Sequence, residues 1–298
     1  MNNKTTSRRS LIKTLAGTAG LGLACSMNAR LSAADGLMPS DINARVNHSV
    51  CKWCYRDIAL EDLCKAAVEI GLTSIELLTP KDFSTLNKYG LECAMVSGGG
   101  GEYSIGNGWN KKENHNGMVE TYLRQIDETA DAGFNQIICF SGNRTNDLGD
   151  EEGMENCAEG LKRIMNHAEK KKVTVVMELL NSKVNHPEYM CDHTNWGVEL
   201  CKKIESDNFK LLYDIYHMQI MEGDVIATIK ENHKYISHYH TGGVPGRNEI
   251  DETQELNYPA IIKAIVDTGY KGFVGQEFIP KRKDQLASLK QGVMICDV

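Results

Sequence analysis

The chain has 298 residues, of which 41% are hydrophobic and 24% charged, and its formal net charge is −7 at pH 7. This length suits one α/β barrel of about 250 residues behind a leader, and the composition is that of an ordinary globular enzyme. The acidic balance argues against a nucleic-acid surface, which usually carries a basic face. After the leader, no segment reaches the roughly 18 apolar residues of a membrane span.

Residues 1–34 are predicted to be an export signal. The segment SRRSLIK, at residues 7–13, resembles a twin-arginine signal, and an apolar run over Leu15–Ala24 follows it. Ser32-Ala33-Ala34 then suits a small-residue cleavage site. We therefore expect a periplasmic protein with one domain over residues 35–298. Lipid attachment at Cys25 and an amphipathic N-terminal helix are the alternatives.

The chain contains ten cysteines, and those after the leader show no disulfide framework spacing. Several lie within apolar patterns and are expected to be small core residues: Cys64, Cys93, Cys139, Cys157 and Cys201. Cys51-Lys52-Trp53-Cys54 has the spacing of a redox or zinc motif, but no second pair accompanies it. Cysteine chemistry is therefore not expected to define the function.

Eight strand-like runs alternate with helical segments along the chain. The expected strands are Arg45–Cys51, Thr73–Leu78, Leu91–Val96, Gln136–Phe140, Val173–Glu178, Phe209–Asp214, Tyr235–His240 and Phe273–Glu277. The expected helices are Ile58–Ile70, Lys81–Tyr89, Met118–Gly133, Glu152–Lys172, His193–Ile204, Asp224–Asn232, Tyr258–Thr268 and one near the C-terminus. Such alternation predicts parallel βαβ units, which close most simply as a (β/α)₈ TIM barrel. An open doubly wound sheet is the alternative.

Four consecutive expected strands end in metal-ligating side chains: Glu178, Asp214, His240 and Glu277. In a barrel the carboxyl ends of the strands meet at one mouth. Three carboxylates and one imidazole suit Mg²⁺ or Mn²⁺, with Zn²⁺ or Co²⁺ also possible. A cation would relieve the repulsion among the three acids. A hydrogen-bonded polar ring without metal is the alternative.

Other polar residues near these strand ends are candidate substrate contacts. His217 follows Asp214 by three residues, so a helical turn would direct both into the site. Arg247 follows a glycine- and proline-containing loop and would fork onto a carboxylate or diol. Asn181 and Lys183 follow the fifth strand, and Trp53 follows the first.

Four segments together resemble the xylose-isomerase-like barrel superfamily, and within it the hydroxypyruvate isomerases. They are Glu178-Leu179-Leu180-Asn181, Tyr213–Gln219, the Val244-Pro245-Gly246-Arg247 loop after the His240 strand, and Gly275-Gln276-Glu277. The similarity extends from about Val46 to Pro280. It implies a barrel, aldose–ketose isomerisation, and a catalytic glutamate pair formed by Glu178 and Glu277. In the related ketose 3-epimerases, the same four strand-end positions hold a divalent metal.

Two features depart from the hydroxypyruvate isomerase pattern. The position of His240 is often a glutamine in that branch, so a histidine here is closer to the metal-binding epimerases. Export is also unusual for the branch. We expect an isomerase that converts hydroxypyruvate to 2-hydroxy-3-oxopropanoate through a metal-stabilised enediolate. A metal-dependent ketose 3-epimerase and a non-catalytic periplasmic sugar-binding barrel are the alternatives.

The expected partner is a small hydroxy-carbonyl compound or sugar. No nucleic acid is expected, because the endonuclease IV enzymes that share the barrel need a larger zinc cluster and a basic face. The sequence leaves a homo-oligomer open.

Overall fold

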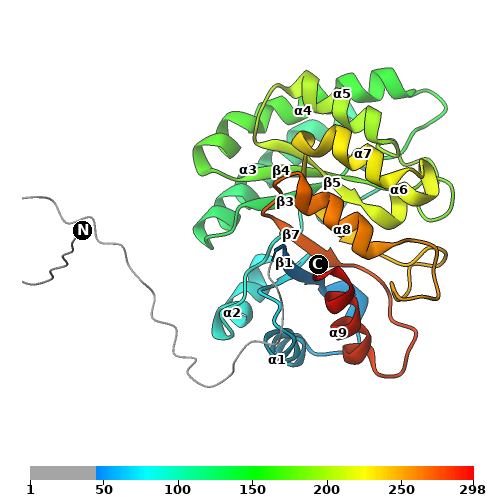
Figure 1. The fold of residues 1–298 in the computed structure, drawn as a ribbon. Coiled ribbons are helices and arrows are strands. Elements are labelled where there is room, and N and C mark those ends of the chain that lie inside the picture. Colours follow the sequence, from blue (N-terminus) through cyan, green and yellow to red (C-terminus); the bar gives the residue numbers. More distant parts are fainter. Residues whose placement is uncertain (1–44) are drawn as a thin grey trace, which may run out of the picture. The chain divides into compact units, whose positions relative to one another are not determined.

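The computed structural model describes residues 45–298, so the predicted export signal and Cys25 lie outside the described residues. Export therefore stays a prediction. Within residues 45–298, parallel strands form one sheet in the order β2-β1-β7-β6-β5-β4-β3. The strands are β1 Asn47–Cys51, β2 Ser74–Glu76, β3 Gln136–Cys139, β4 Thr174–Leu179, β5 Phe209–Asp214, β6 Ile236–Thr241 and β7 Phe273–Gln276. Helices lie around the outside of this sheet (Figure 1).

The third expected strand, Leu91–Val96, closes the ring without forming a regular strand. It makes parallel bridges to β2, through Ser74 and Glu92, and to β3 through Val96. Between them, the backbone N–H of Ala94 donates to the Ser74 hydroxyl at 2.9 Å instead of to a backbone carbonyl. This side-chain contact interrupts the ladder. The prediction of a (β/α)₈ barrel is confirmed, whereas the prediction of a regular third strand was wrong.

The α-helices are α1 Leu60–Ile70, α2 Pro80–Lys88, α3 His115–Asp131, α4 Asp150–Lys171, α5 Thr194–Ile204, α6 Ile215–Met221, α7 Val225–Asn232, α8 Tyr258–Asp267 and α9 Gln285–Cys296. Three short 3₁₀ turns are η1 Lys52–Tyr55, η2 Lys112–Asn114 and η3 His233–Tyr235. Local sequence explains where several of these helices begin or end. Gly71 ends α1 at φ 98°, and Thr79 and Asp82 form a capping box for α2. None of the described helices is long and apolar enough to cross a membrane.

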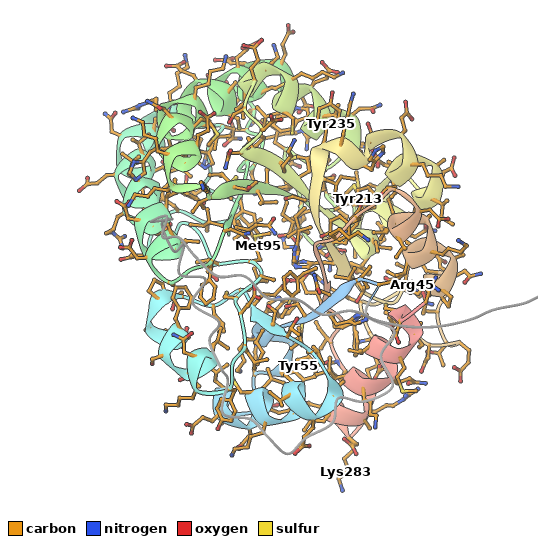
Figure 2. The ribbon with its side chains drawn as sticks, turned by 60° about the vertical axis from the view of Figure 1, so that its left-hand side comes forward. Arg45, Tyr55, Met95, Tyr213, Tyr235 and Lys283 are labelled. Carbon is orange, nitrogen blue, oxygen red and sulfur yellow. The ribbon has the colours of Figure 1, made fainter. Side chains whose placement is uncertain are left out.

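The inside of the barrel is apolar on one side and polar on the other. A small cluster of buried side chains, Met95, Ile138, Val176 and Leu212, is separate from the large core that packs against the helices; Met95 is labelled in Figure 2. Across from it, the interior is polar and fully buried at Ser49, Ser74, Glu76, His238 and His240. Buried polar groups need partners, and this polar half leads directly into the candidate site.

Candidate active site

A cavity of about 440 Å³ opens where the strands end, which is where the catalytic groups of such barrels lie. Its polar wall contains Glu178, His186, Arg247 and Glu277. The apolar part of the lining is formed by Leu77, Ile105, Ile138, Phe140 and Leu180. Trp53, Arg56, Ser97 and Gly98 complete the lining. A concave site with a few convergent polar groups is the usual form of a small-molecule pocket.

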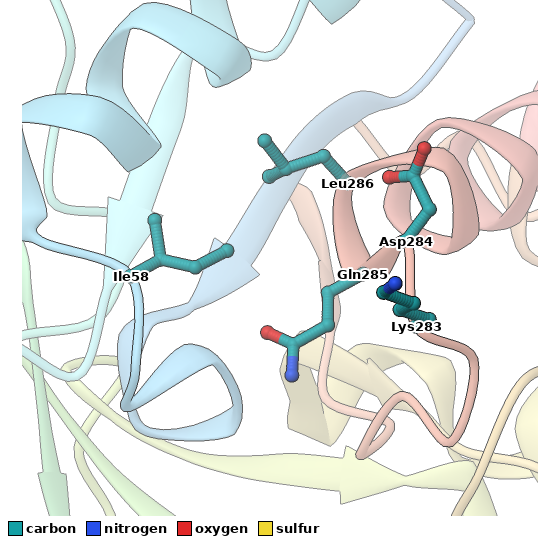
Figure 3. Close-up of a pocket in the computed structure, with 5 residues that line it drawn as sticks. All are labelled: Ile58, Lys283, Asp284, Gln285 and Leu286. Atoms are coloured by element: carbon teal, nitrogen blue, oxygen red, sulfur yellow. The ribbon is translucent and has the colours of Figure 1, made fainter.

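A second cleft, shown in Figure 3, lies between Ile58 and the start of α9. It measures about 460 Å³ and is lined by Ile58, Lys283, Asp284, Gln285 and Leu286. The Asp284 carboxylate already accepts a hydrogen bond from the Ala287 N–H at 2.9 Å and caps α9. This cleft lies away from the strand-end carboxylates Glu178 and Glu277, which line the first cavity, so the first cavity is the candidate active site.

The four strand-end residues predicted to bind a cation come together beside this cavity. One ligand atom from each of four residues lies within 4.8 Å of the others, namely Glu178, Asp214, His240 and Glu277. All four are buried, and Glu178 and Glu277 line the cavity. They come from β4, the end of β5, β6 and the residue after β7. The register, in which Asp214 pairs with His240, sets them side by side.

Arg247 lies among these acids. Its Nη2 is 3.1 Å from Asp214 Oδ2 and 2.5 Å from Glu277 Oε2. Its guanidinium is 5.1 Å from the Trp53 ring centroid and 5.4 Å from that of Tyr216. The guanidinium offsets the repulsion among the carboxylates. Nη2 is therefore held by two protein carboxylates, whereas Nε has no hydrogen-bond partner and the residue still lines the cavity.

Glu178 Oε1 is buried and lacks a hydrogen-bond partner. It lies 3.6 Å from His240 Nδ1, and the same Nδ1 is paired with Glu277 Oε2 at 2.8 Å. Buried polar atoms are rarely left unpaired. Carboxylate oxygens with one imidazole nitrogen are ligands that a divalent cation accepts. The residues present thus fit a divalent cation.

The two candidate catalytic glutamates have oppositely shifted pKa values. Burial, reinforced by the nearby charge of Glu277, raises the pKa of Glu178. Burial acts in the same direction on Glu277, but Arg247 and His240 outweigh it and hold the pKa of Glu277 well below its ordinary value. Oppositely shifted carboxyls are typical of a general acid and a general base that work as a pair.

Asp214 is held by its neighbours on α6. Its Oδ1 accepts the backbone N–H of His217 at 3.1 Å and caps the helix. The backbone N–H of Asn181 donates to His217 Nδ1 at 3.1 Å, which leaves Nε2 to carry the ring proton. Nε2 lies 3.7 Å from Asp214 Oδ2. Burial raises the pKa of Asp214 to about 8, although Arg247 opposes the shift. His217 and Asn181 do not line the cavity and instead support Asp214.

Trp53 is the predicted substrate contact with the most direct link to the site. Its indole Nε1–H donates to Glu277 Oε1 at 2.7 Å, and its ring lines the cavity.

Lys183, another predicted substrate contact, lies at the end of α6. Its ammonium group donates to the carbonyls of Ile220 and Met221, at 3.1 and 2.9 Å, so it caps the end of α6 and does not line the cavity.

Sequence reasoning did not identify Glu76, Arg56 or His186. Glu76 is fully buried on β2, and the signal available was an acid between two apolar residues, Ile75 and Leu77. Arg56 and His186 line the cavity, but both come from connecting segments, where the sequence pattern does not indicate which way a side chain points.

Cys51 and Cys54 are free, buried thiols. Burial raises the pKa of each well above its ordinary value, which makes a reactive thiol unfavourable.

The fold and the strand-end site together define a barrel enzyme with a paired-glutamate centre. The chain belongs to the family described as xylose isomerase-like TIM barrel, whose model matches residues 64–293. It is 28% identical over 238 residues to a 2-oxo-tetronate isomerase of Cupriavidus necator, covering 76% of this chain and 90% of that protein. It is 30% identical over 149 residues to the hydroxypyruvate isomerase of Escherichia coli, covering 50% of this chain and 57% of that protein.

Solved structures agree on the fold. An AP endonuclease of family 2 from Brucella melitensis superposes with a TM-score of 0.71 at 24% identity, over 85% of this chain and 97% of that one. A D-psicose 3-epimerase from Clostridium cellulolyticum H10 superposes with a TM-score of 0.68 at 16% identity, over 85% of this chain and 100% of that one. The resemblance to hydroxypyruvate isomerases is confirmed by the sequence relatives. The chain is an enzyme of the isomerase and epimerase class.

Proposed function

We propose that this protein isomerises a small hydroxy-substituted 2-oxo acid, with hydroxypyruvate to 2-hydroxy-3-oxopropanoate as the reference reaction. The observation that carries the proposal is the pair Glu178 and Glu277. Both line one cavity, both belong to the group that fits a divalent cation, and their pKa values are shifted in opposite directions. The names of two relatives, a 2-oxo-tetronate isomerase and a hydroxypyruvate isomerase, support the same class of substrate.

The two glutamates divide the proton transfer between them. Glu277, held ionised by Arg247 and His240, removes a proton from the hydroxyl-bearing C3 of hydroxypyruvate. The electron pair of the broken C–H bond forms the C2–C3 double bond of an enediolate, and the C2 carbonyl oxygen takes up the negative charge. Glu178, whose raised pKa favours the protonated form, then delivers a proton to C2. The hydroxyl proton on the C3 oxygen passes, directly or through water, to the negatively charged oxygen on C2, so that C3 becomes the carbonyl and C2 carries the hydroxyl. The glutamates exchange protons with water between turnovers.

Glu178, Asp214, His240 and Glu277 would hold the cation. When bound, a divalent ion such as Mg²⁺ or Mn²⁺ supplies positive charge that polarises the substrate carbonyl. The chain itself orients the reacting groups, since Trp53 and Arg247 fix the Glu277 carboxylate. The apolar residues of the lining lower the local polarity, which strengthens these electrostatic interactions.

A ketose 3-epimerase is the second candidate, and the contacts of Arg247 are compatible with it. An epimerase of neutral sugars needs no clamp for a substrate carboxylate, and one nitrogen of Arg247, Nη2, is held by Asp214 and Glu277. In this reaction the two glutamates would act on opposite faces of a single carbon.

One experiment tests the proposal directly. The purified protein is analysed for bound metal and then incubated in heavy water with hydroxypyruvate, a four-carbon 2-oxo acid and neutral ketoses. We expect solvent deuterium to enter an acid substrate at C2 as the product forms. If deuterium entered only the neutral ketoses, at C3, the protein would be an epimerase instead. If a sugar bound without any deuterium uptake, the protein would be a non-catalytic barrel.

Arg56 is expected to contact the carboxylate of an acid substrate. It is exposed and lines the cavity, its Nε donates to the Trp53 carbonyl at 3.2 Å, and its guanidinium is 5.7 Å from the Trp53 ring centroid. Within residues 45–298 it forms no ion pair with a carboxylate, so it is free to receive one. Arg56→Gln should raise KM for the acid about 10-fold, as loss of a charged hydrogen bond predicts.

Steady-state kinetics on an acid and on a neutral ketose check this expectation. KM for the neutral compound should not change, and Arg124→Gln, which removes an exposed arginine that pairs with Glu128 on α3, is the matched control. An equal rise of KM for both compounds would mean that Arg56 does not recognise the acid group.

A further inference from the structure

We infer that Glu76 is a positioning residue that sets which nitrogen of His240 faces the cation site. The inference rests on the cation site of the proposed function and adds to it a residue on the opposite side of the ring. Glu76 is on β2, is fully buried, and does not line the cavity. It therefore acts only through the residues that it contacts.

The Glu76 carboxylate lies where an imidazole N–H would donate to it. Its Oε1 is 2.6 Å from His240 Nε2 and 2.9 Å from His238 Nε2. The Cys51 thiol adds a contact at 3.5 Å. The Nε2 side of the His240 ring thus faces a carboxylate oxygen at hydrogen-bond distance.

This contact has a consequence at the other ring nitrogen. Without a cation, both ring nitrogens face carboxylate oxygens. A cation at Nδ1 would displace the proton on that nitrogen and leave a neutral imidazole with one N–H and one lone pair. The carboxylate acceptor at Nε2 keeps the remaining proton there, so Nδ1 is the nitrogen that offers its lone pair to the cation site. Nδ1 is the atom 2.8 Å from Glu277 Oε2 and 3.6 Å from Glu178 Oε1. Carboxylates behind metal-binding histidines fix ring orientation in this way.

Gly275 on β7 leaves space for the contact between Glu76 and His240. In the parallel register it pairs with His240. A Cβ at this position would come within 3.0 Å of both Glu76 Oε1 and His240 Cδ2, which is closer than real Cβ atoms approach. The absence of a side chain at residue 275 is therefore needed for the Glu76–His240 contact, and the variant Gly275→Ala disturbs the same contact from a different strand.

A second cation bound by Cys51, Glu76 and His240 is the competing explanation, because their ligand atoms also lie within 4.8 Å of one another. Two contacts argue against it. The Glu76–His240 distance of 2.6 Å is that of a direct hydrogen bond, and the same carboxylate oxygen is already shared with His238.

The test measures Mn²⁺ binding to the metal-free full chain by calorimetry. Glu76→Gln and Gly275→Ala should each weaken Mn²⁺ binding about 10–100-fold, the usual cost of losing such a contact. Glu92→Gln is the matched control, because Glu92 lies on the adjoining barrel segment with an exposed side chain, and it should bind Mn²⁺ like the wild type.

A second measurement determines which nitrogen of the His240 ring carries the proton. ¹⁵N NMR of labelled histidines in the Mg²⁺-loaded protein should place the His240 proton on Nε2 in the wild type and show the other tautomer appearing in both variants. Wild-type affinity in Glu76→Gln, with Mn²⁺ bound stoichiometrically, would overturn the positioning role while leaving the cation site intact. Failure of the wild type to bind Mn²⁺ would overturn the cation site and this inference together. Should Glu76→Gln not fold, Gly275→Ala decides by the same two measurements.

Discussion

Glu178→Gln and Glu277→Gln should each lower the turnover of the acid substrate by about 10²–10⁴-fold, the range typical of a lost general acid or base. Each change keeps the shape of the side chain but removes the group that carries the proton. Glu178 Oε1 makes no hydrogen bond, so its amide replacement disturbs few contacts. Glu277 accepts hydrogen bonds from Trp53 and Arg247, so its replacement is also expected to lower stability.

Deuterium uptake from heavy water separates the two roles. If Glu277 removes the proton and Glu178 returns it, Glu178→Gln should still exchange the C3 hydrogen with solvent while forming little product. Glu277→Gln should neither exchange the C3 hydrogen nor form product. Glu252→Gln, an exposed acid in the loop after β6, should react like the wild type. A near-normal rate in either active-site variant would remove that glutamate from the mechanism.

The sequence predicted the strand-end residues because each closes a recognisable strand-like run. Glu178, Asp214 and His240 lie at the ends of β4, β5 and β6, and Glu277 follows β7, so counting strands in a barrel was enough to bring them together. Their actual contacts needed three dimensions. Arg247 was expected to contact substrate alone, but the loop that carries it places Nη2 between two carboxylates.

Glu76 shows where sequence reasoning stopped. Strand periodicity places Ser74 and Glu76 on the same face, yet it does not say that this face is the polar half of the interior or that β6 lies across from it. That depends on closure of the ring, which runs through the irregular Leu91–Val96 segment. The partner of Glu76 is His240, far along the chain, and no local pattern encodes such a pair.

Arg247→Gln is expected to have a large effect on stability that depends on metal. In the metal-free protein, Arg247 is the cation nearest to Asp214 and Glu277, which are both buried. Removing one partner of a buried ion pair usually costs about 3–5 kcal/mol because the remaining charge has no compensation. The free energy of unfolding, measured in urea with a chelator present, should fall by about that amount.

Mn²⁺ should restore part of this loss, because a divalent cation in the Glu178, Asp214, His240 and Glu277 group would compensate the same carboxylates. Ligands that bind only the folded state stabilise it by mass action, so added Mn²⁺ should stabilise Arg247→Gln more than it stabilises the wild type. Arg56→Gln, which removes a guanidinium that makes no ion pair within residues 45–298, should unfold like the wild type under both conditions. If Mn²⁺ stabilises Arg247→Gln no more than the wild type, the guanidinium and the metal do not serve the same carboxylates, and the assignment of Asp214 and Glu277 as shared ligands fails.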